Sequence, residues 1–132
     1  MSYQFYNRAR GNGSKYNAHK VEFEGMTFDS RKELRRYKTL RQLEEEGQIF
    51  NLQRQVKFVL IPAIHEPDII GPRGGRKPGK LIERECSYYA DFKYLDAQGR
   101  QIVEDTKGMK TPDYIIKRKL LLYIHGIRIK EI

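Results

Sequence analysis

Several features that mark whole classes of protein are scarce or missing in this sequence. Cys86 is its one cysteine, so no internal disulfide can form, and such a chain is typical of a reducing compartment. No apolar run approaches the roughly 18 residues of a membrane-spanning helix, and no signal-peptide pattern is present. The histidines are isolated and lack the spacing of a zinc site: His19, His65 and His125. The sequence therefore disfavours membrane, secreted and zinc-dependent classes and predicts a cytoplasmic protein.

Positive charge is present in excess. The 132 residues carry 26 Lys and Arg against 17 Asp and Glu, a formal net charge of +9. Hydrophobic residues make up 39% of the chain, which is enough for the modest core of one domain. A basic excess attracts nucleic acid or an anionic membrane surface. Because the membrane classes are disfavoured, we expect a nucleic acid as the partner.

Two segments concentrate this charge. Residues 1–20 contain four cations and no acid, which predicts a flexible basic N-terminal arm, although an inert terminus explains the same pattern. Residues 63–80 are rich in Pro and Gly and are predicted to be a loop with no acid between Gly71 and Lys80. A long loop inside a compact domain is usually functional or disordered. We expect a DNA-contacting flap whose contact residues are Arg73, Arg76, Lys77 and Lys80.

Residues 21–132 are predicted to form a single mixed α/β domain. A small hairpin is expected around Glu24-Gly25. Helix start and stop signals place one helix from Asp29-Ser30 to about Glu46 and another over Pro112–His125. Strands are predicted over residues 55–61, 81–95, 102–107 and 127–132. This alternation predicts a mixed sheet flanked by helices.

Charged residues occupy the centre of the predicted strands between Tyr88 and Gly108. Side chains of a strand point alternately to its two faces, so Asp105 and Lys107 share one face and Glu104 points the other way. Asp91 lies on the neighbouring strand. Such a cluster is costly to bury unless it holds a metal ion or performs chemistry. The pattern therefore predicts a metal-dependent catalytic site.

Glu33 is a further candidate, carried by the first predicted helix. It falls near the middle of the apolar arc of that helix, where a carboxylate would point toward the sheet. Ser30-x-x-Glu33 is also a capping box, in which Glu33 bonds back to the helix start. Both interpretations, a third site carboxylate and a helix cap, fit the sequence.

Cations gather on both predicted helices. The first begins with Arg31, Lys32 and Arg35, which suit an external anion such as a phosphate, although a solvated charged face accounts for them equally well. The second carries Lys117 and Lys119. These five residues complete the set of candidate DNA contacts.

The site residues resemble the PD-(D/E)XK nuclease superfamily. Its pattern is a helix Glu, an Asp on one strand and (D/E)-x-K on the next, and the matches here are Glu33, Asp91 and Asp105-Thr106-Lys107. The resemblance implies a restriction-endonuclease-like core of order α-β-β-β-α-β. It also implies Mg²⁺, or Mn²⁺ as a substitute, held by Asp91, Asp105 and Glu33, with Lys107 as a further catalytic residue. Ala90 stands where the name-giving Pro would precede Asp91.

More specifically, the sequence resembles small phage-encoded nucleases and Holliday junction resolvases. It implies an endonuclease that cuts branched DNA in recombination or DNA processing, acts as a homodimer, and works in the host-cell cytoplasm if phage-encoded. A DNA-binding module with a vestigial site is the alternative. An RNA-binding basic protein would explain the charge but would leave Asp91, Asp105 and Lys107 without a role.

Overall fold

A four-stranded mixed sheet forms the centre of the domain. The computed structural model describes residues 19–132, so the predicted N-terminal arm lies almost wholly outside the described residues. The strand order is β10-β9-β8-β3. The strands span Phe50–Ile61 in β3, Cys86–Leu95 in β8, Gln101–Asp105 in β9 and Lys130–Glu131 in β10. β10 runs parallel to β9, and the other neighbours are antiparallel. The predicted mixed α/β class is confirmed.

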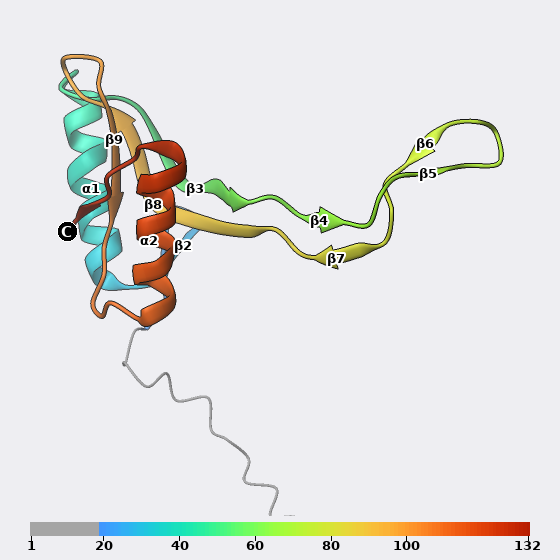
Figure 1. Cartoon of the computed structure of the whole chain (residues 1–132). Coiled ribbons are helices and arrows are strands. Elements are labelled where there is room, and N and C mark those ends of the chain that lie inside the picture. The colour runs from blue at the N-terminus through green and yellow to red at the C-terminus, as the bar shows by residue number, and fades with distance from the viewer. Residues whose placement is uncertain (1–18) are drawn as a thin grey trace, which may run out of the picture.

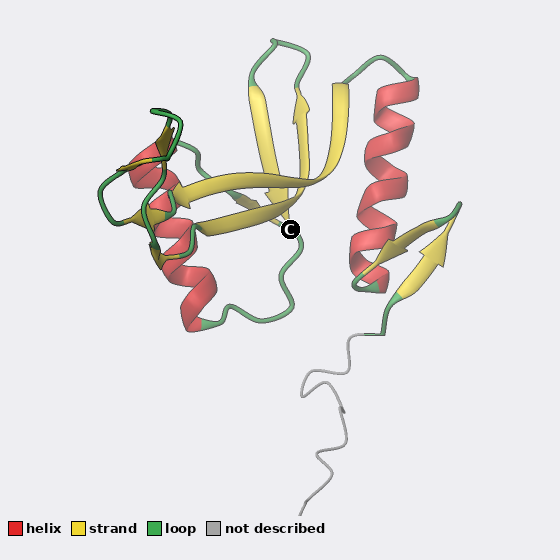
Figure 2. Ribbon diagram, turned by 90° about the vertical axis from the view of Figure 1, so that its right-hand side faces the viewer, coloured by secondary structure: helices red, strands yellow, loops and turns green. Residues whose placement is uncertain are grey.

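Two helices cover opposite faces of this sheet (Figure 2). α1 spans Arg31–Glu45 and begins at Ser30, whose hydroxyl accepts a hydrogen bond from the Glu33 amide. α2 spans Pro112–His125, with Thr111 as its N-cap and a left-handed Gly126 at its end. Both helices were expected from these signals. Neither helix of the described region is long and apolar enough to cross a bilayer.

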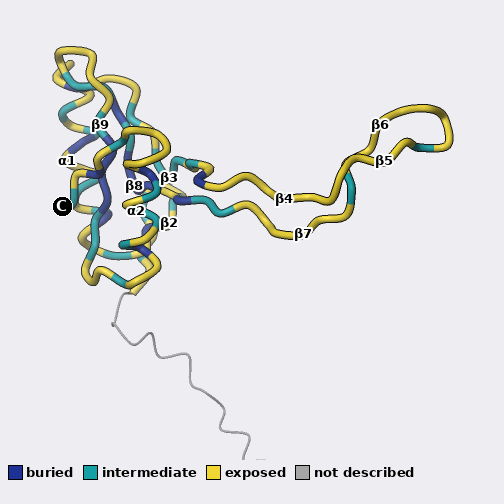
Figure 3. The backbone as a smooth tube through the Cα atoms, viewed as in Figure 1, coloured by how far each residue is buried: buried dark blue, intermediate teal, exposed yellow. Residues whose placement is uncertain are grey.

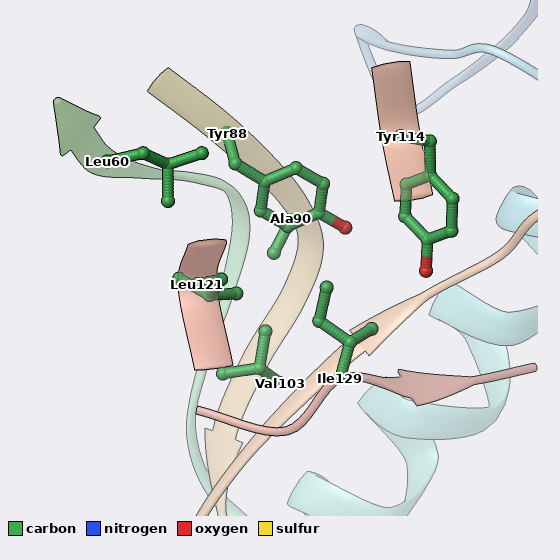
Figure 4. Close-up of a cluster of buried hydrophobic side chains, with 7 residues drawn as sticks. All are labelled: Leu60, Tyr88, Ala90, Val103, Tyr114, Leu121 and Ile129. Atoms are coloured by element: carbon green, nitrogen blue, oxygen red, sulfur yellow. The ribbon is translucent and has the colours of Figure 1, made fainter. Parts of the chain in front are cut away.

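The sheet separates two hydrophobic cores. The core under α2 contains seven buried residues, which Figure 4 shows together: Leu60, Tyr88, Ala90, Val103, Tyr114, Leu121 and Ile129. The core under α1 is smaller and contains Leu40, Ile49, Phe92 and Tyr94. Each fully buried large apolar side chain contributes roughly 1.5–3 kcal/mol. Both cores are therefore needed to hold the sheet between its helices.

β8 changes sides in mid-strand. Tyr88 and Ala90 belong to the core under α2, whereas Phe92 and Tyr94 belong to the core under α1, although all four positions are even-numbered. The change falls at Asp91, which lies opposite Gln55 of β3. Gln55 has a left-handed backbone, with a φ of 49°. Left-handed backbone is uncommon for a residue other than glycine. The long strands of the sheet curve strongly (Figure 2), and the regular alternation of β8 is interrupted at Asp91.

A small hairpin precedes α1. β1 (Val21–Phe23) and β2 (Met26–Phe28) pair through a two-residue turn, as predicted. Glu24 and Gly25 of that turn have φ values of 49° and 75°, which are typical of the hairpin turns that match strand twist. The buried Phe28 ring packs against Tyr37, at a centroid distance of 5.1 Å, so the hairpin is fixed to α1.

A two-stranded ribbon (residues 62–85) extends far from the domain body (Figure 1). β4 (Ile64–His65) pairs with β7 (Leu81–Glu83), and β5 (Ile69–Ile70) pairs with β6 (Arg76–Lys77). Almost the whole ribbon is exposed (Figure 3). The predicted structureless loop over residues 63–80 is therefore corrected to short paired strands.

Other boundaries differ from the prediction as well. β3 begins at Phe50 instead of residue 55, because its irregular first half includes a left-handed Asn51 that hides the alternation. The predicted strand over 81–95 is split into β7 and β8. β9 ends at Asp105, so Lys107 lies in the following loop, and the last strand shrinks to Lys130–Glu131.

Candidate functional site

A cleft of about 530 Å³ opens where α1 begins and β9 ends. The N-caps of both helices lie on its wall, together with the loop after β9. Its lining residues are Asp29, Ser30, Lys32, Glu33, Asp91, Thr106, Lys107, Gly108, Met109 and Thr111. Three of the four predicted catalytic residues line this cleft, and the fourth, Asp105, contacts one of them.

Asp91 and Asp105 lie on adjacent strands, as the sequence pattern predicts. Phe92 pairs with Glu104 in the antiparallel register, which puts Asp91 opposite Asp105. The two carboxylates are 8% and 0% exposed. Asp91 Oδ2 accepts hydrogen bonds from the Thr106 amide at 2.8 Å and from the Thr106 hydroxyl at 2.7 Å. Thr106, the middle residue of the predicted D-x-K, thus fixes one oxygen of Asp91.

Asp105 is held through one of its two carboxylate oxygens. Its Oδ2 accepts a hydrogen bond from the Tyr88 hydroxyl and lies 3.2 Å from Lys107 Nζ. Its Oδ1 is buried and has no hydrogen-bond partner among the described residues. Burial, followed by the Asp91 carboxylate, raises the pKa of Asp105 to about 7, while Tyr88 and Lys107 act in the opposite direction. Asp105 is therefore poised to change its charge near neutral pH.

Lys107 is positioned by two neighbours. Besides its ion pair with Asp105, its Nζ lies 4.8 Å from the centroid of the Tyr114 ring, close enough for a cation–π interaction. The side chain is 30% exposed, so its ammonium reaches the cleft. Asp105 and Lys107 therefore act on the same side of the sheet, as expected from their spacing.

Glu33 caps the helix with one carboxylate oxygen and turns the other toward the remaining candidate residues. Its Oε2 accepts a hydrogen bond from the Asp29 amide at 3.1 Å, which caps the helix one residue earlier than a standard capping box. Its Oε1 faces the site, where Gln55 Nε2 lies at 3.2 Å. The residue is 2% exposed. Burial, then the Asp91 carboxylate, raises its pKa above the ordinary range.

Gln55 is a site residue that sequence reasoning missed. Its side-chain Nε2 donates to Glu33 Oε1 at 3.2 Å and to Asp91 Oδ1 at 3.4 Å. It thus bridges two carboxylates that would otherwise repel each other. Gln55 has a left-handed backbone and is an exposed residue of β3. A glutamine within a strand carries no sequence signal of this kind, so only the fold reveals it.

Glu104 belongs to a different cluster, as its place in the alternation predicts. It is 0% exposed and accepts hydrogen bonds from Arg36 Nε at 2.8 Å and from the Tyr94 hydroxyl. Lys130 Nζ lies 3.7 Å away. A buried carboxylate with this many donors is structurally satisfied. Glu104 therefore joins α1 to the sheet. Of the two adjacent acids on β9, Asp105 is the candidate site residue.

A protein-family model matches residues 13–129, and its description reads "Protein of unknown function (DUF1064)". The chain belongs to this family. The match spans Glu33, Asp91, Asp105 and Lys107, so the cleft lies inside the DUF1064 domain. Neither the curated proteins nor the solved structures include a match to the chain.

The cations of the DUF1064 domain that were predicted to contact DNA do not lie on one surface. Lys32 lines the cleft, beside the exposed Arg31 and Arg35 on the first turns of α1. Arg73, Arg76, Lys77 and Lys80 lie on the ribbon. Lys119 lines a separate hollow with Arg118 and Arg128, and Lys117 is half-buried on α2. Of these predicted contacts, the structure therefore places Lys32 on the cleft with the carboxylates, and Arg31 and Arg35 are exposed on the same helix outside the cleft lining.

The oxygens of the cleft suit a hard divalent cation. Within residues 19–132, no three His, Cys, Asp or Glu side chains are gathered closely enough to make a ready metal site. Hydrogen-bond donors from Gln55, Thr106 and Tyr88 hold most of the carboxylate oxygens instead. Asp105 Oδ1 is buried and accepts no hydrogen bond from the described residues. An orphaned carboxylate oxygen is costly, and Mg²⁺ and Mn²⁺ prefer oxygen ligands, so the donor set fits such an ion.

Proposed function

We propose that this DUF1064 protein is a metal-dependent DNA endonuclease with a restriction-endonuclease-like core. One observation carries the proposal: the buried carboxylates of Glu33 and Asp91 line one cleft with Lys107, whose ammonium pairs with the buried Asp105, in a strongly basic chain. Burying Glu33, Asp91 and Asp105 together costs stability, and such a costly cluster is typical of a site that performs chemistry. Their order along the chain is that of the PD-(D/E)XK pattern described above.

Asp91 and Asp105 would hold the cation, with Glu33 Oε1 as the third carboxylate oxygen. Bound Mg²⁺, or Mn²⁺ in its place, would polarise the phosphate and lower the pKa of water. Asp105 Oδ1 is the oxygen that the protein itself leaves without a donor. Gln55 would give up its contacts to the Glu33 and Asp91 oxygens, or share them, when the cation is held.

Lys107 would act on the attacking water and on the phosphate charge. Its ammonium lies 3.2 Å from Asp105 Oδ2, so it is held close to the carboxylates. A fixed ammonium beside the scissile phosphate stabilises the negative charge that develops on the phosphate oxygens. It can also orient a water molecule for attack. Lys32, on the rim of the cleft, is placed to hold a neighbouring phosphate.

The resemblance to junction resolvases supports a preference for branched DNA in phage recombination or DNA processing. Two symmetric cuts in a junction need two sites, and therefore a homodimer, acting in the cytoplasm of the host cell. The alternative is a DNA-binding module with a vestigial site. Retained carboxylates beside a phosphate would weaken binding if no metal were held, so the intact set favours the nuclease.

Cleavage of labelled four-way junction, duplex and single-stranded DNA, in Mg²⁺ and in EDTA, tests this proposal. We expect Mg²⁺-dependent paired nicks in the junction, and loss of cleavage with retained binding for Asp91→Asn. Asp96→Asn, in the turn between β8 and β9, is the matched control and should cut normally. Tight binding without cleavage in any metal would favour the binding module, and equal cutting of all substrates would remove the junction preference.

A further inference from the structure

The ribbon exposes large apolar side chains beside cations. Ile69, Ile70 and Ile82 are 57%, 78% and 56% exposed, and Ile64 and Leu81 are 47% and 45% exposed. An isolated two-stranded ribbon is marginally stable in water, and exposed apolar groups on it mark an interaction site. The ribbon therefore needs a partner beyond the domain body.

Both faces of the ribbon tip have the same chemical character. Ile69 pairs with Lys77, and Ile70 pairs with Arg76. Paired residues of neighbouring strands project to the same face, so each face carries one isoleucine and one cation. A partner that surrounds the tip on both sides and presents apolar and anionic groups would match it.

The turn at the tip adds positive charge without any acid. Arg73, Arg76 and Lys77 surround a hollow of about 410 Å³ at the glycine-rich turn. None of the three forms an ion pair with any residue in 19–132. The acids of the ribbon lie nearer its base, at Glu66, Asp68, Glu83 and Glu85. The tip is therefore a local concentration of unneutralised cations, which favours a polyanion over a second copy of this basic chain.

The shape of the ribbon is fixed by backbone contacts. The Glu66 amide donates to the Lys80 carbonyl at 2.8 Å, and the Gly71 amide donates to the Gly75 carbonyl at 2.8 Å. A Cβ on Gly79 would lie 2.3 Å from the Glu66 carbonyl oxygen and 2.4 Å from that of Pro67. Only glycine allows the two strands to approach so closely at this point. The ribbon is therefore preformed for its partner.

We propose that the tip of the ribbon, residues 69–77, inserts into the major groove of duplex DNA. This groove admits a two-stranded β-ribbon, while its base edges offer thymine methyls and guanine acceptors and its walls are phosphates. The isoleucines suit the methyl groups, and Arg73, Arg76 and Lys77 suit guanine edges and phosphates. From Ile61 to Gly74 the chain reaches at most about 40 Å, a little more than one turn of the duplex of about 34 Å. The ribbon is therefore long enough to reach along about one helical turn of the duplex.

This inference rests on DNA as the substrate of the proposed function, so the first experiment separates the two. Fluorescence anisotropy measures binding of a labelled duplex of about 30 base pairs in EDTA at several salt concentrations. Arg73→Ala/Arg76→Ala is compared with Arg100→Ala/Arg128→Ala, which removes two exposed arginines outside the cleft and the ribbon. We expect the ribbon pair to weaken binding at least tenfold and to reduce the salt slope by roughly two, and the control pair to change less.

Groove-specific modification locates the contact. Methylation of guanine N7 blocks the major groove, whereas netropsin occupies the minor groove. We expect N7 methylation of the duplex to weaken wild-type binding at least fivefold, netropsin to have little effect, and the ribbon pair to be insensitive to methylation. Gly79→Ala, which deforms the ribbon, should behave like the ribbon pair.

Several outcomes would overturn the inference. If wild type cuts DNA in Mg²⁺ but the ribbon pair binds duplex with unchanged affinity and salt slope, the ribbon is not a DNA contact, while the proposed nuclease stands. Loss of dimerisation, or of binding to anionic vesicles, with DNA binding intact would assign the ribbon to another partner. If wild type neither binds nor cuts DNA, both proposals fail together.

Discussion

Apolar side chains are ordinarily buried and charged side chains exposed, and the cleft and the ribbon depart from this rule in opposite ways. The cleft buries charge, with Glu33, Asp91 and Asp105 at 2%, 8% and 0% exposure. The ribbon exposes apolar surface, with Ile70 at 78%. Burying charge lowers the stability of the fold, and exposing apolar side chains lowers solubility. Neither cost is fully offset by an interaction within the described part of the chain. We propose that something outside the chain explains each region: a cation and a phosphate for the cleft, and a nucleic-acid groove for the ribbon.

The largest expected effect comes from removing a carboxylate of the cleft. Asp91→Asn or Asp105→Asn should lower the cleavage rate by a hundredfold to a thousandfold or more, because charge stabilisation in the transition state is lost. DNA affinity in EDTA should be retained or increased, since a negative charge beside the phosphate is removed. Single-turnover cleavage and anisotropy measure the two effects separately. Cleavage at the wild-type rate would remove these residues from the proposed site.

The buried charge of Asp105 should also make stability depend on pH. Its pKa of about 7 in the folded protein lies above the value of about 3.8 in the unfolded chain. The folded state therefore binds this proton more tightly, so the contribution of Asp105 to stability is fully present below about pH 4 and is lost as the pH rises through about 7. The loss is at most roughly 4 kcal/mol, at 1.36 kcal/mol per pKa unit. Urea titrations in EDTA should show this fall in wild type and a smaller one in Asp105→Asn.

A smaller effect is expected from Gln55. Gln55→Ala removes the amide that bridges Glu33 and Asp91, and should lower the free energy of unfolding in EDTA by about 0.5–1.5 kcal/mol. Gln53→Ala, an exposed glutamine on the same strand, is the control and should change it less. Urea titration measures both. A drop of equal size in the control would mean that the amide bridge contributes nothing specific.

The smallest effect should come from the ribbon itself. Ile70→Ser should change the free energy of unfolding by less than about 0.5 kcal/mol, because its side chain is 78% exposed. Leu121→Ala, in the core under α2, should cost roughly 2–5 kcal/mol. A large loss for Ile70→Ser would show that the ribbon is held by the domain body, and the contrast between the two regions would disappear.

The parts of the cleft carried by local patterns could be predicted from the sequence. Alternation along β9 separates Asp105 from Glu104, and the hairpin turn places Asp91 on the neighbouring strand. The caps at Ser30 and Thr111 define where both helices begin. Each of these signals acts within a few residues, so no knowledge of the tertiary structure is needed to read it.

The remaining features depend on contacts between distant segments. Gln55 reaches Glu33 and Asp91 only because β3 bends, and Arg36 meets Glu104 across 68 positions of the sequence. The ribbon strands are two or three residues long, which is too short for an alternating pattern to appear. The sequence marks the charge of the ribbon but gives no sign of its paired strands.

The two helix N-caps on the cleft wall have an electrostatic consequence. Ser30 and Thr111 both line the cleft, so the positive ends of two helix dipoles face the same opening. Each end acts as roughly half an elementary charge. Together they supply about one positive charge that no change of pH, lysine modification or salt-bridge loss can remove. A phosphate approaching the buried carboxylates therefore meets a permanent attractive field, built into the backbone, that offsets part of their repulsion.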